Sequence, residues 1–283
     1  MEKFSEETNK LIDLALQEDI RDGDVTSLYF VPADQTSSAY IYAKADGVLA
    51  GVDVALEVFR RVDGEIKIKA VKNDGDSLKY GDHVLEIEGG SRSILTAERT
   101  ALNFLQRLSG IATNTSKYVA LTEGTKAQIL DTRKTTPGWR QLEKRAVVAG
   151  GGTNHRMGLY DRAMVKDNHI VAQNKIEAMQ EAIHQLKKDR PNVEVELEAD
   201  NLTQVEDFLR MEGVDYILLD NMDNDQMIRA VEMRGKSGPR LEASGGVNLT
   251  TVQGIAQTGV DFISVGALTH SAVALDLSLE FAG

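Results

Sequence analysis

The pattern of apolar and polar residues changes along the chain, and each change marks a different kind of structure. Residues 5–19 place their apolar side chains on one face of a predicted helix. Over residues 37–95 the pattern becomes short alternating stretches such as "SAYIYAKADG" and "DHVLEIEGG", separated by Gly and Asp, which is typical of an antiparallel sheet. A long helix is expected over residues 96–124, with Thr96 as its N-cap.

After this helix, short apolar runs alternate with helical patterns. This alternation predicts parallel strands joined by right-handed crossovers. Six strands, fewer than the eight of a regular barrel, indicate an incomplete α/β barrel. The expected strands are 127–131, 162–167, 193–198, 216–220, 240–244 and 261–265, and the expected helices between the later strands are 175–188, 202–213 and 223–235.

Polar or small residues end or directly follow the six expected strands. The carboxyl ends of barrel strands meet around one mouth, and barrel enzymes place their chemistry there. We therefore expect one site to gather Asp131, Lys166, Glu198, Asp220, Ser244 and Gly266.

The charge of the chain is unevenly distributed. The formal net charge is -12, yet residues 131–169 hold eight Lys or Arg, four Asp or Glu, and two of the five His. An acidic chain repels nucleic-acid phosphates, so the local basic cluster indicates a small anionic ligand instead. The chain has no cysteine, which excludes disulfides, a thiolate nucleophile and cysteine zinc sites, and it fits a cytoplasmic protein. The first residues, "MEKFSEETNK", differ from a secretory signal, and no apolar run reaches the ~20 residues of a membrane span.

Two pairs of neighbouring residues in the basic cluster are candidate substrate contacts. Arg133 and Lys134 follow an expected strand, where a guanidinium binds carboxylates through two bonds and a lysine suits phosphate. A solvated charge pair is the alternative. His155 and Arg156 follow the glycines of "GGGTNHRMG", which permit either a close backbone approach or a simple turn. We favour substrate contact for this second pair.

Two further residues close the cluster. Lys166 ends an apolar strand, where burial of its charge is costly unless an anion meets it. His169 fits either a catalytic acid or base or, as we favour, a hydrogen-bonded structural histidine.

Acidic side chains end two successive strands. Glu198 and Asp220 can hold Mg²⁺ or bond to sugar hydroxyls, and a structural ion pair with Lys134 or Lys166 is the alternative. Glu196 shares the face of Glu198, which leaves it as a second candidate.

The loops after the last two strands are candidates for a phosphate site. "EASGGVNL" and "ISVGALTHS" are rich in small residues whose backbone N–H groups can surround a phosphate, although simple turns are the alternative. His270 is an additional donor there. Arg99 near the expected helix start opposes the helix dipole, and this unfavourable position favours a functional role, although solvent exposure is the alternative explanation.

Taken together, these motifs resemble quinolinate phosphoribosyltransferase of the decarboxylating type. The resemblance covers nearly the whole chain in order, through "QEDIRDGDVTS", "ERTALNFLQRLSGIAT", "DTRKTTPG", "GGGTNHRMGL", "KDNHI", "LLDN", "EASGGV" and "SVGALTHS". It implies an N-terminal α/β sandwich domain over 1–112, joined by the segment 271–283, and an incomplete TIM-like α/β barrel over 113–270.

The resemblance also implies an activity. The family joins quinolinate to phosphoribosyl pyrophosphate with Mg²⁺ and releases CO₂ and pyrophosphate, which gives nicotinate mononucleotide for NAD biosynthesis; no organic cofactor is expected. It assigns the quinolinate contacts to Arg99, Arg133, His155, Arg156 and Lys166. It assigns the phosphoribosyl pyrophosphate contacts to Lys134, Glu198, Asp220, Ser244, Gly245, Gly246, Gly266 and His270.

The family pattern makes four of these residues catalytic and two of them neighbours of the metal. The catalytic residues would be Lys134, Lys166, Glu198 and Asp220, with Mg²⁺ near the last two. Arg99 would enter the site of a neighbouring subunit, so a homodimer would be the smallest active unit. Two alternatives stay open: a related enzyme that uses nicotinate or another pyridine acid, and a phosphate-sensing barrel without chemistry.

Overall fold

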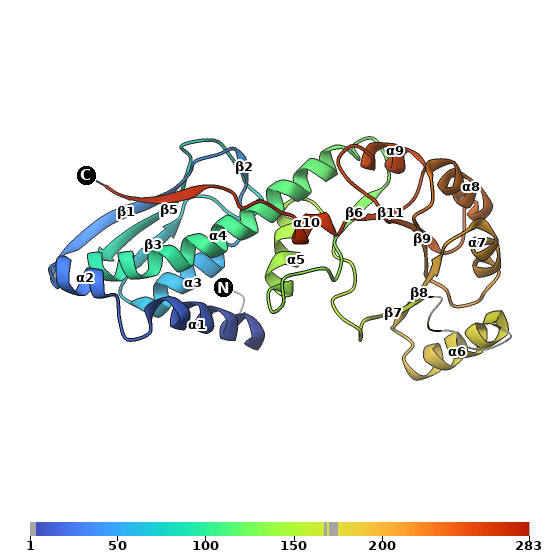
Figure 1. Cartoon of the computed structure of the whole chain (residues 1–283), viewed down its shortest axis with the longest axis horizontal. Helices are drawn as coiled ribbons and strands as arrows, with labels where there is room; N and C mark the ends of the chain where they lie inside the picture. The colour runs from blue at the N-terminus through green and yellow to red at the C-terminus, as the bar shows by residue number, and fades with distance from the viewer. Residues whose placement is uncertain (1–3, 167–168, 170–174, 283) are drawn as a thin grey trace. The chain divides into compact units, whose positions relative to one another are not determined.

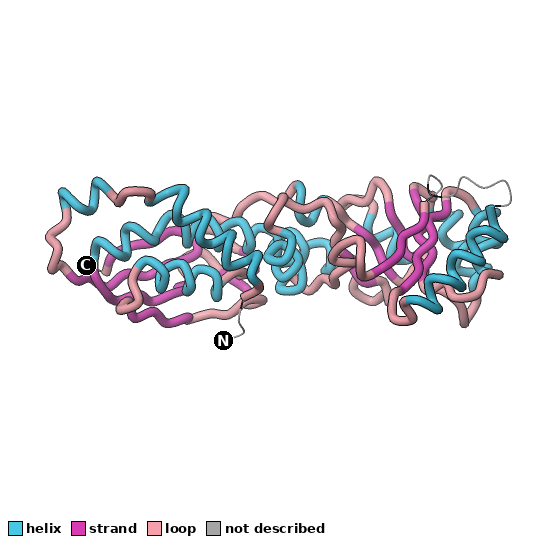
Figure 2. Tube along the Cα trace, turned by 90° about the horizontal axis from the view of Figure 1, so that it is seen from below, coloured by secondary structure: helices cyan, strands magenta, loops and turns pink. Residues whose placement is uncertain are grey.

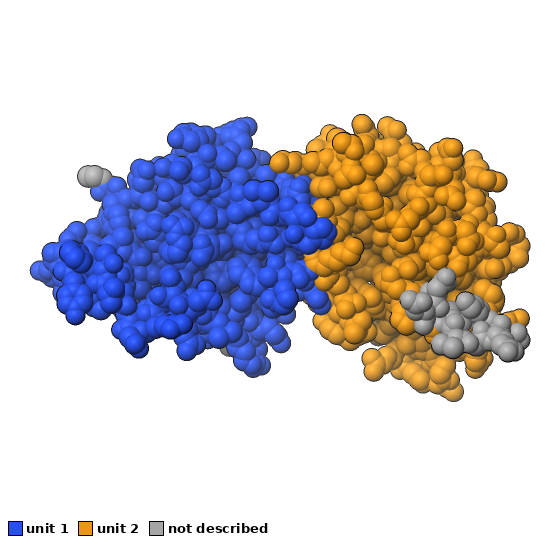
Figure 3. Space-filling view, viewed as in Figure 1, with its two compact units in different colours: residues 1–116, 135–151, 268–283 blue, residues 117–134, 152–267 orange. Residues whose placement is uncertain are grey.

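The structure is a computed structural model that describes residues 4–166, 169 and 175–282. It contains two compact units (Figures 1 and 3). Unit 1 comprises residues 1–116, 135–151 and 268–283, and unit 2 comprises residues 117–134 and 152–267. These units are defined by internal contacts, so the expected boundaries of independently folding domains, 1–112 with 271–283 and 113–270, stay a prediction.

Unit 1 is built on a four-stranded antiparallel sheet with the strand order β12-β1-β5-β3. Its strands are β12 (Leu277–Phe281), β1 (Thr36–Ala43), β5 (His83–Gly90) and β3 (Lys67–Ala70), and a small second sheet pairs β2 (Gly47–Val48) with β4 (Ser77–Leu78). Along β1 the side chains of Ala39, Ile41 and Ala43 are buried, while Tyr40 and Tyr42 between them are not. The period of two therefore turns one face of the sheet toward the core. The antiparallel sheet expected from the alternating pattern is confirmed.

Helices supply the other half of this core. They are α1 (Glu6–Ile20), α2 (Val25–Phe30), α3 (Val52–Val62), α4 (Ser91–Ala120) and α5 (Arg140–Ala149), followed near the end of the chain by α10 (Ala267–His270). Ser5 caps α1, because its side chain accepts a hydrogen bond from the backbone of Thr8. The helix α3 buries Val54, Val58 and Phe59 on one face.

The long helix α4 begins earlier than expected. It starts at Ser91, directly after β5, so the prediction of Thr96 as its N-cap is wrong. The buried Ser91 instead donates its backbone N–H to the carbonyl of Gln35 at 2.9 Å, and its side chain bonds to Ser37. Arg99 consequently lies beyond the first turn and is exposed, and the argument that its charge opposes the helix dipole is wrong as well.

Unit 2 is built on a six-stranded parallel sheet with the order β6-β11-β10-β9-β8-β7. Its strands are β6 (Gln128–Leu130), β7 (Arg162–Val165), β8 (Glu194–Ala199), β9 (Tyr216–Asp220), β10 (Arg240–Ser244) and β11 (Phe262–Ser264). The strands lie side by side, with helices outside them (Figures 1 and 2). Within the described residues β6 and β7 each pair with one strand of this sheet, which leaves the barrel incomplete, as the count of six strands predicted.

The crossover helices of unit 2 follow the expected pattern. They are α6 (Lys175–Asp189), α7 (Leu202–Leu209), α8 (Asn224–Arg234) and α9 (Val252–Gln257). Asn201 caps α7, and Asp223 caps α8 in a reciprocal arrangement with Gln226. Over the described part of the chain, no helix has the length and apolar character that a membrane span requires.

Register sets which side chains meet at the carboxyl ends of these strands. Ser244 lies opposite Asp220, and both Glu242 and Glu198 lie opposite Leu218. Because alternate residues of a strand share one face, these side chains lie in rows on the inner face of the barrel, and the rows end at its mouth.

A glycine at the start of α3 provides a test of this packing. Gly51 has φ +92°, and a Cβ there would lie 2.7 Å from Leu108 Cδ1. We expect Gly51→Ala to lower the free energy of unfolding by about 1–3 kcal/mol, because it combines backbone strain with a clash. Urea denaturation measures this loss. The control Gly64→Ala meets nothing within 4 Å and should leave stability nearly unchanged; equal effects of the two substitutions would contradict the assignment.

Candidate active site

The carboxyl ends of the parallel strands surround a pocket of about 300 Å³ in unit 2. It contains eight of the residues singled out in the sequence: Arg133, Lys134, His155, Arg156, Lys166, Glu198, Asp220 and Ser244. The remaining lining residues are Thr132, Met164, Leu218, Glu242 and Ser264. The prediction that positive residues from distant segments converge at the barrel mouth is confirmed.

Two loop segments carry the first of these residues, and a buried aspartate joins them. Asp131 follows β6 and is fully buried, and its Oδ1 accepts the backbone N–H of His155 at 2.9 Å. A parallel bridge between Leu130 and Thr153 holds the same two segments together. The basic pair Arg133 and Lys134 and the pair that begins at His155 are therefore brought to the same edge of the sheet.

The arginine pair of the pocket is held under mutual repulsion. Burial lowers the pKa of Arg156, and the positive charge of Arg133 lowers it further. The guanidinium of Arg156 donates from Nη1 to the carbonyl of Arg162 at 3.0 Å, which fixes its direction. A partly buried cation beside a like charge is stabilised by an anionic ligand, and such perturbed groups concentrate at functional sites.

The acidic side of the pocket combines an ion pair with a carboxylate cluster. Lys166 Nζ pairs with Glu198 Oε2, so one of the ion pairs considered from the sequence is present. Oxygens of Glu198, Asp200 and Asp220 lie within 4.8 Å of one another. Mg²⁺ prefers such oxygen ligands, and these side chains fit a divalent cation that a phosphorylated substrate would carry. Asp200 is an addition that the sequence reasoning missed.

A second acidic cluster borders the pocket from the barrel interior, and its members Glu242 and His155 also belong to the lining. Glu196 on β8 and Glu242 on β10 are fully buried, and His155 Nε2 lies 3.2 Å from Glu196 Oε2 and 3.3 Å from Glu242 Oε1. Arg162 Nη1 lies 3.6 Å from Glu196 Oε2, which adds a second positive charge. The choice between Glu196 and Glu198 is thus decided: Glu198 lines the pocket, while Glu196 lies in the interior.

These buried contacts shift the protonation of all three side chains. Burial alone would lower the pKa of His155, but hydrogen bonds to Glu196 and Glu242 and their charges outweigh it and raise the pKa to about 9. Burial and the charge of Glu242 raise the pKa of Glu196. Burial acts to raise the pKa of Glu242 too, but His155 and the Ser264 hydroxyl lower it overall.

The two ring nitrogens of His155 face different partners: Nε2 faces the carboxylates of Glu196 and Glu242, and Nδ1 faces the backbone of Arg156. The backbone N–H of Arg156 approaches His155 Nδ1 at 2.6 Å and can donate only to an unprotonated nitrogen, so it opposes the second protonation. Nε2 carries its hydrogen toward the two glutamates whether the ring is neutral or charged.

The loop after β10 contains two glycines with positive φ. Gly245 and Gly246 have φ +92° and +61°, and a Cβ on Gly245 would lie 2.1 Å from Asn221 Oδ1. The backbone N–H of Asn221 donates to the Ser244 carbonyl at 2.9 Å, which holds the neighbouring loop after β9 against this turn. Only glycine fits the close approach at Gly245.

Several expected site residues lie outside the pocket lining. Gly245, Gly246 and Gly266 lie in the loops after β10 and β11, and Arg99 and His270 belong to unit 1. His169 accepts the backbone N–H of Lys166 at Nδ1, 2.9 Å away, which confirms the interpretation as a hydrogen-bonded histidine. The other residues of "KDNHI" after the lysine, 167, 168 and 170, lie outside the described residues.

The glycines of "GGGTNHRMG" form a turn in part. Gly150 caps the end of α5, and a Cβ there would lie 2.4 Å from the carbonyl of Ala112. Gly151 has φ +85°. The turn considered from the sequence is therefore present at these two glycines, while the function of the segment rests on His155 and Arg156.

Glu242 is the most informative residue that the sequence reasoning did not single out. It lies at the centre of the expected strand "RLEAS", between the apolar residues Leu241 and Ala243. A charged residue in the interior of a parallel strand is rare unless it is paired, and that pattern could have identified it.

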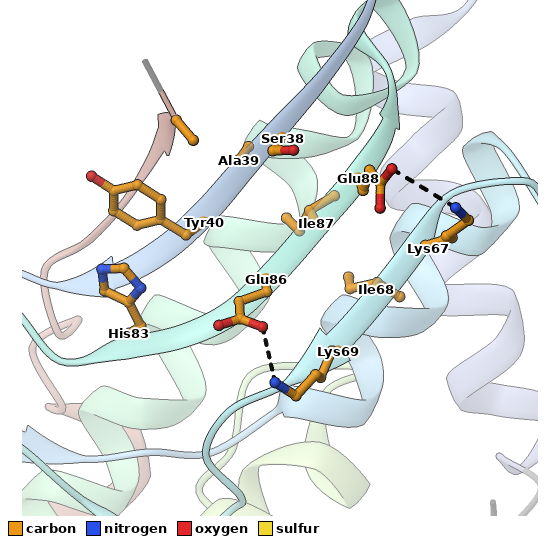
Figure 4. A pocket seen from close by; sticks show the side chains of 11 residues that line it. Ser38, Ala39, Tyr40, Lys67, Ile68, Lys69, His83, Glu86, Ile87 and Glu88 are labelled. Carbon is orange, nitrogen blue, oxygen red and sulfur yellow. Dashed lines mark hydrogen bonds and ion pairs between the residues drawn. The ribbon is translucent and has the colours of Figure 1, made fainter.

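Unit 1 carries another hollow, on the outer face of its sheet (Figure 4). Lys69 Nζ pairs with Glu86 at 3.0 Å and Lys67 Nζ with Glu88 at 3.8 Å, while the rings of Tyr40 and His83 stack. The charges along this face compensate one another, in contrast to the excess of positive charge in the unit 2 pocket. We therefore place the candidate chemistry in unit 2.

Comparisons with known proteins point to one family over nearly the whole chain. The family models "Quinolinate phosphoribosyl transferase, N-terminal domain" and "C-terminal domain" match residues 24–109 and 111–280. A nicotinate-nucleotide pyrophosphorylase [carboxylating] of Mycobacterium leprae is 44% identical over 94% of this chain and 94% of its own. Quinolinate phosphoribosyltransferase [decarboxylating] 2a, mitochondrial, of Nicotiana tabacum is 41% identical over 95% and 81%.

A solved structure agrees with these sequence relatives. The nicotinate-nucleotide pyrophosphorylase from Francisella tularensis superposes with a TM-score of 0.89 at 38% identity and covers 99% of this chain and 98% of its own.

The raised pKa of His155 makes stability depend on pH. Its folded pKa of about 9 lies above the ordinary value of 6.5, so the stabilisation is fully present below about pH 6.5 and is lost as the pH rises through 9. The complete loss corresponds to about 3 kcal/mol. Urea denaturation at about pH 6 and pH 9.5 should show this decrease in the wild-type chain. His155→Gln should lack it, and the same pH dependence in both chains would contradict the assignment.

Proposed function

The chain belongs to the quinolinate phosphoribosyltransferase family, and we propose that its unit 2 pocket joins quinolinate to phosphoribosyl pyrophosphate. The products are nicotinate mononucleotide, CO₂ and pyrophosphate, so the enzyme serves NAD biosynthesis. The observation that carries this proposal is the gathering of Arg133, Lys134, Arg156 and Lys166 in one pocket beside Glu198 and Asp220.

The positive side chains of the pocket offset the electrostatic repulsion between the two substrates of this reaction. Quinolinate is a dianion and phosphoribosyl pyrophosphate carries several negative charges, so the two substrates repel each other. A preorganised basic pocket offsets this repulsion and orients the ring nitrogen toward the anomeric carbon. We assign the two carboxylates of quinolinate to Arg133 and Arg156, whose guanidinium groups bind carboxylates through paired hydrogen bonds.

The remaining pocket residues suit the ribosyl donor. Lys134 and Lys166 lie between the two substrates in this proposal, and Glu198 and Asp220 face the ribose. As the ring nitrogen bonds to the anomeric carbon and pyrophosphate leaves with the electron pair, positive charge grows on the ribose, and nearby carboxylates stabilise it. Mg²⁺ carried by the donor would be held near Glu198, Asp200 and Asp220 and would offset charge on the leaving pyrophosphate.

The second step needs little from the protein. The ribosylated ring nitrogen is cationic, so the adjacent C–C bond can break and release CO₂ while its electron pair stays on the ring carbon. The cation stabilises this carbanion, which a proton then quenches. The loops around Ser244–Gly246 and Gly266, with His270, would hold the 5-phosphate through backbone and side-chain donors.

We extend the proposal to the assembly and the compartment. Arg99 is exposed on α4 of unit 1, which fits a side chain that completes the site of a partner subunit. The active unit is then a homodimer with shared sites. The cysteine-free chain fits the reducing cytoplasm.

The direct test is a turnover experiment. The chain is incubated with quinolinate, phosphoribosyl pyrophosphate and Mg²⁺, and nicotinate mononucleotide is detected by mass together with released CO₂. Nicotinate in place of quinolinate provides the control for acceptor choice. Product from nicotinate but not from quinolinate would assign the related reaction instead, and ligand-induced stabilisation without pyrophosphate release would indicate a binding protein.

The two arginines should act on quinolinate alone. We expect Arg133→Ala and Arg156→Ala each to raise the quinolinate KM with the fold intact, because each removes a charge-assisted contact of about 1.5–3 kcal/mol. Steady-state kinetics at saturating phosphoribosyl pyrophosphate measures the effect. Arg210→Ala, which removes an exposed arginine paired with Glu206 on α7, is the matched control and should leave the KM unchanged. Unchanged kinetics in both pocket variants would remove them from the site.

A shared site predicts complementation. We expect an inactive Arg99→Ala chain mixed with an inactive Arg133→Ala chain to recover part of the activity, because a hybrid dimer holds one site with both arginines intact. Activity is measured after unfolding and refolding the mixture. If hybrid dimers form, as shown by native mass spectrometry, and activity stays absent, Arg99 does not act across the interface.

A further inference from the structure

Two buried glutamates, one of which contributes to the pocket lining, have no part in the proposed chemistry. Glu196 and Glu242 are fully buried on β8 and β10. Burying carboxylates is costly unless they are paired and hydrogen-bonded. Their position below a site that must attract a dianion makes the cost larger, because negative charge there repels the substrate.

The glutamates converge on one histidine. His155 Nε2 lies 3.2 Å from Glu196 Oε2 and 3.3 Å from Glu242 Oε1. Ser264 on β11 donates its hydroxyl to the same Oε1 of Glu242 at 2.5 Å, and Arg162 on β7 lies 3.6 Å from Glu196. Four strands thus contribute to the support of a single ring.

The other side of the ring is bound to the segment that carries Arg156. The backbone nitrogen of Arg156 lies 2.6 Å from His155 Nδ1, and the backbone N–H of His155 donates to Asp131 Oδ1 at 2.9 Å. The Arg156 guanidinium then reaches the carbonyl of Arg162 at 3.0 Å and Met164 Sδ at 3.6 Å. A shift of the ring would therefore move the backbone from which this guanidinium extends.

We propose that Glu242 is a positioning residue for the quinolinate side of the pocket: by fixing the ring of His155 it fixes Arg156 in the direction that meets a substrate carboxylate. The inference rests on the proposed function. Glu242 is the better probe of the two glutamates, because Glu196 also faces Arg162 at 3.6 Å and its loss would disturb that cation as well as His155. Glu242 also lines the pocket itself.

Two substitutions separate this role from general support of the core. Glu242→Leu keeps similar bulk and removes the carboxylate that faces His155 Nε2 and accepts the Ser264 hydroxyl. We expect its quinolinate KM to rise about tenfold or more, with the KM for phosphoribosyl pyrophosphate changed by less than about twofold. The reason is that a displacement of the Arg156 guanidinium by about 1 Å weakens its contact with quinolinate, whereas Arg156 has no assigned contact with the second substrate. Glu242→Gln keeps an acceptor oxygen at the same reach and should raise the quinolinate KM by less than about threefold.

A matched control comes from the same layer of strands. Glu194 on β8 pairs with Arg162 at 2.8 Å and accepts a hydrogen bond from Tyr216, whereas the carboxylates that face His155 are those of Glu196 and Glu242. Glu194→Gln therefore removes a barrel carboxylate without touching the ring, and we expect both KM values to stay at the wild-type level.

The outcomes divide clearly. A wild-type chain that forms no nicotinate mononucleotide overturns the proposed function. An active wild-type chain whose Glu242→Leu variant has an unchanged quinolinate KM, or equal increases in both KM values, overturns the positioning role alone. If Glu242→Leu fails to fold, Glu242→Asp replaces it, because aspartate keeps the charge but withdraws the carboxylate from His155. Its quinolinate KM should then rise selectively, and a wild-type value would overturn the role.

Discussion

Repulsion between Arg133 and Arg156 is the constraint on which the rest of the site depends. Burial disfavours the charged form of Arg156, the positive charge of Arg133 disfavours it further, and the pKa of Arg156 is lowered as a result. The barrel maintains this arrangement through hydrogen bonds from neighbouring segments and through carboxylates on the facing strands. An anionic substrate bound between the two guanidinium groups replaces this repulsion with attraction, which contributes to its binding free energy.

The four carboxylates discussed above differ in how deeply they are buried in the barrel. Those at the mouth, Glu198 and Asp220, face the pocket, where a sugar and a metal-bearing phosphate can reach them. The other two, Glu196 and Glu242, are fully buried, although Glu242 also contributes to the pocket lining, and they are compensated by His155 and Arg162. Strand β8 supplies a member of each pair, Glu196 and Glu198. Residues two apart on a strand share a face, and Glu198 lies nearer to the carboxyl end of the strand. The chemistry and its support are therefore stacked along the same strands.

The family membership and the geometry explain each other. The two family models cover both units, and the pocket contains the basic and acidic side chains that a transfer between two anionic substrates requires. Fold alone does not establish chemistry, since barrels carry many activities. The specific content is the combination of paired arginines, two lysines and two carboxylates at the ends of consecutive strands.

The sequence by itself determined the parallel strands, their number and the residues at their carboxyl ends, because these follow from local hydrophobic periodicity and from short motifs. It therefore predicted that Lys166, Glu198 and Asp220 meet at one mouth and that Arg133 follows the end of another strand. It failed at the start of α4, where Ser91 is held by Gln35, just before β1, and by Ser37 within β1, while Thr96 offers a competing local signal. The pairing of Glu242 with His155 also depends on the tertiary structure, since strand register and a loop far away in the chain decide which buried charge meets which partner.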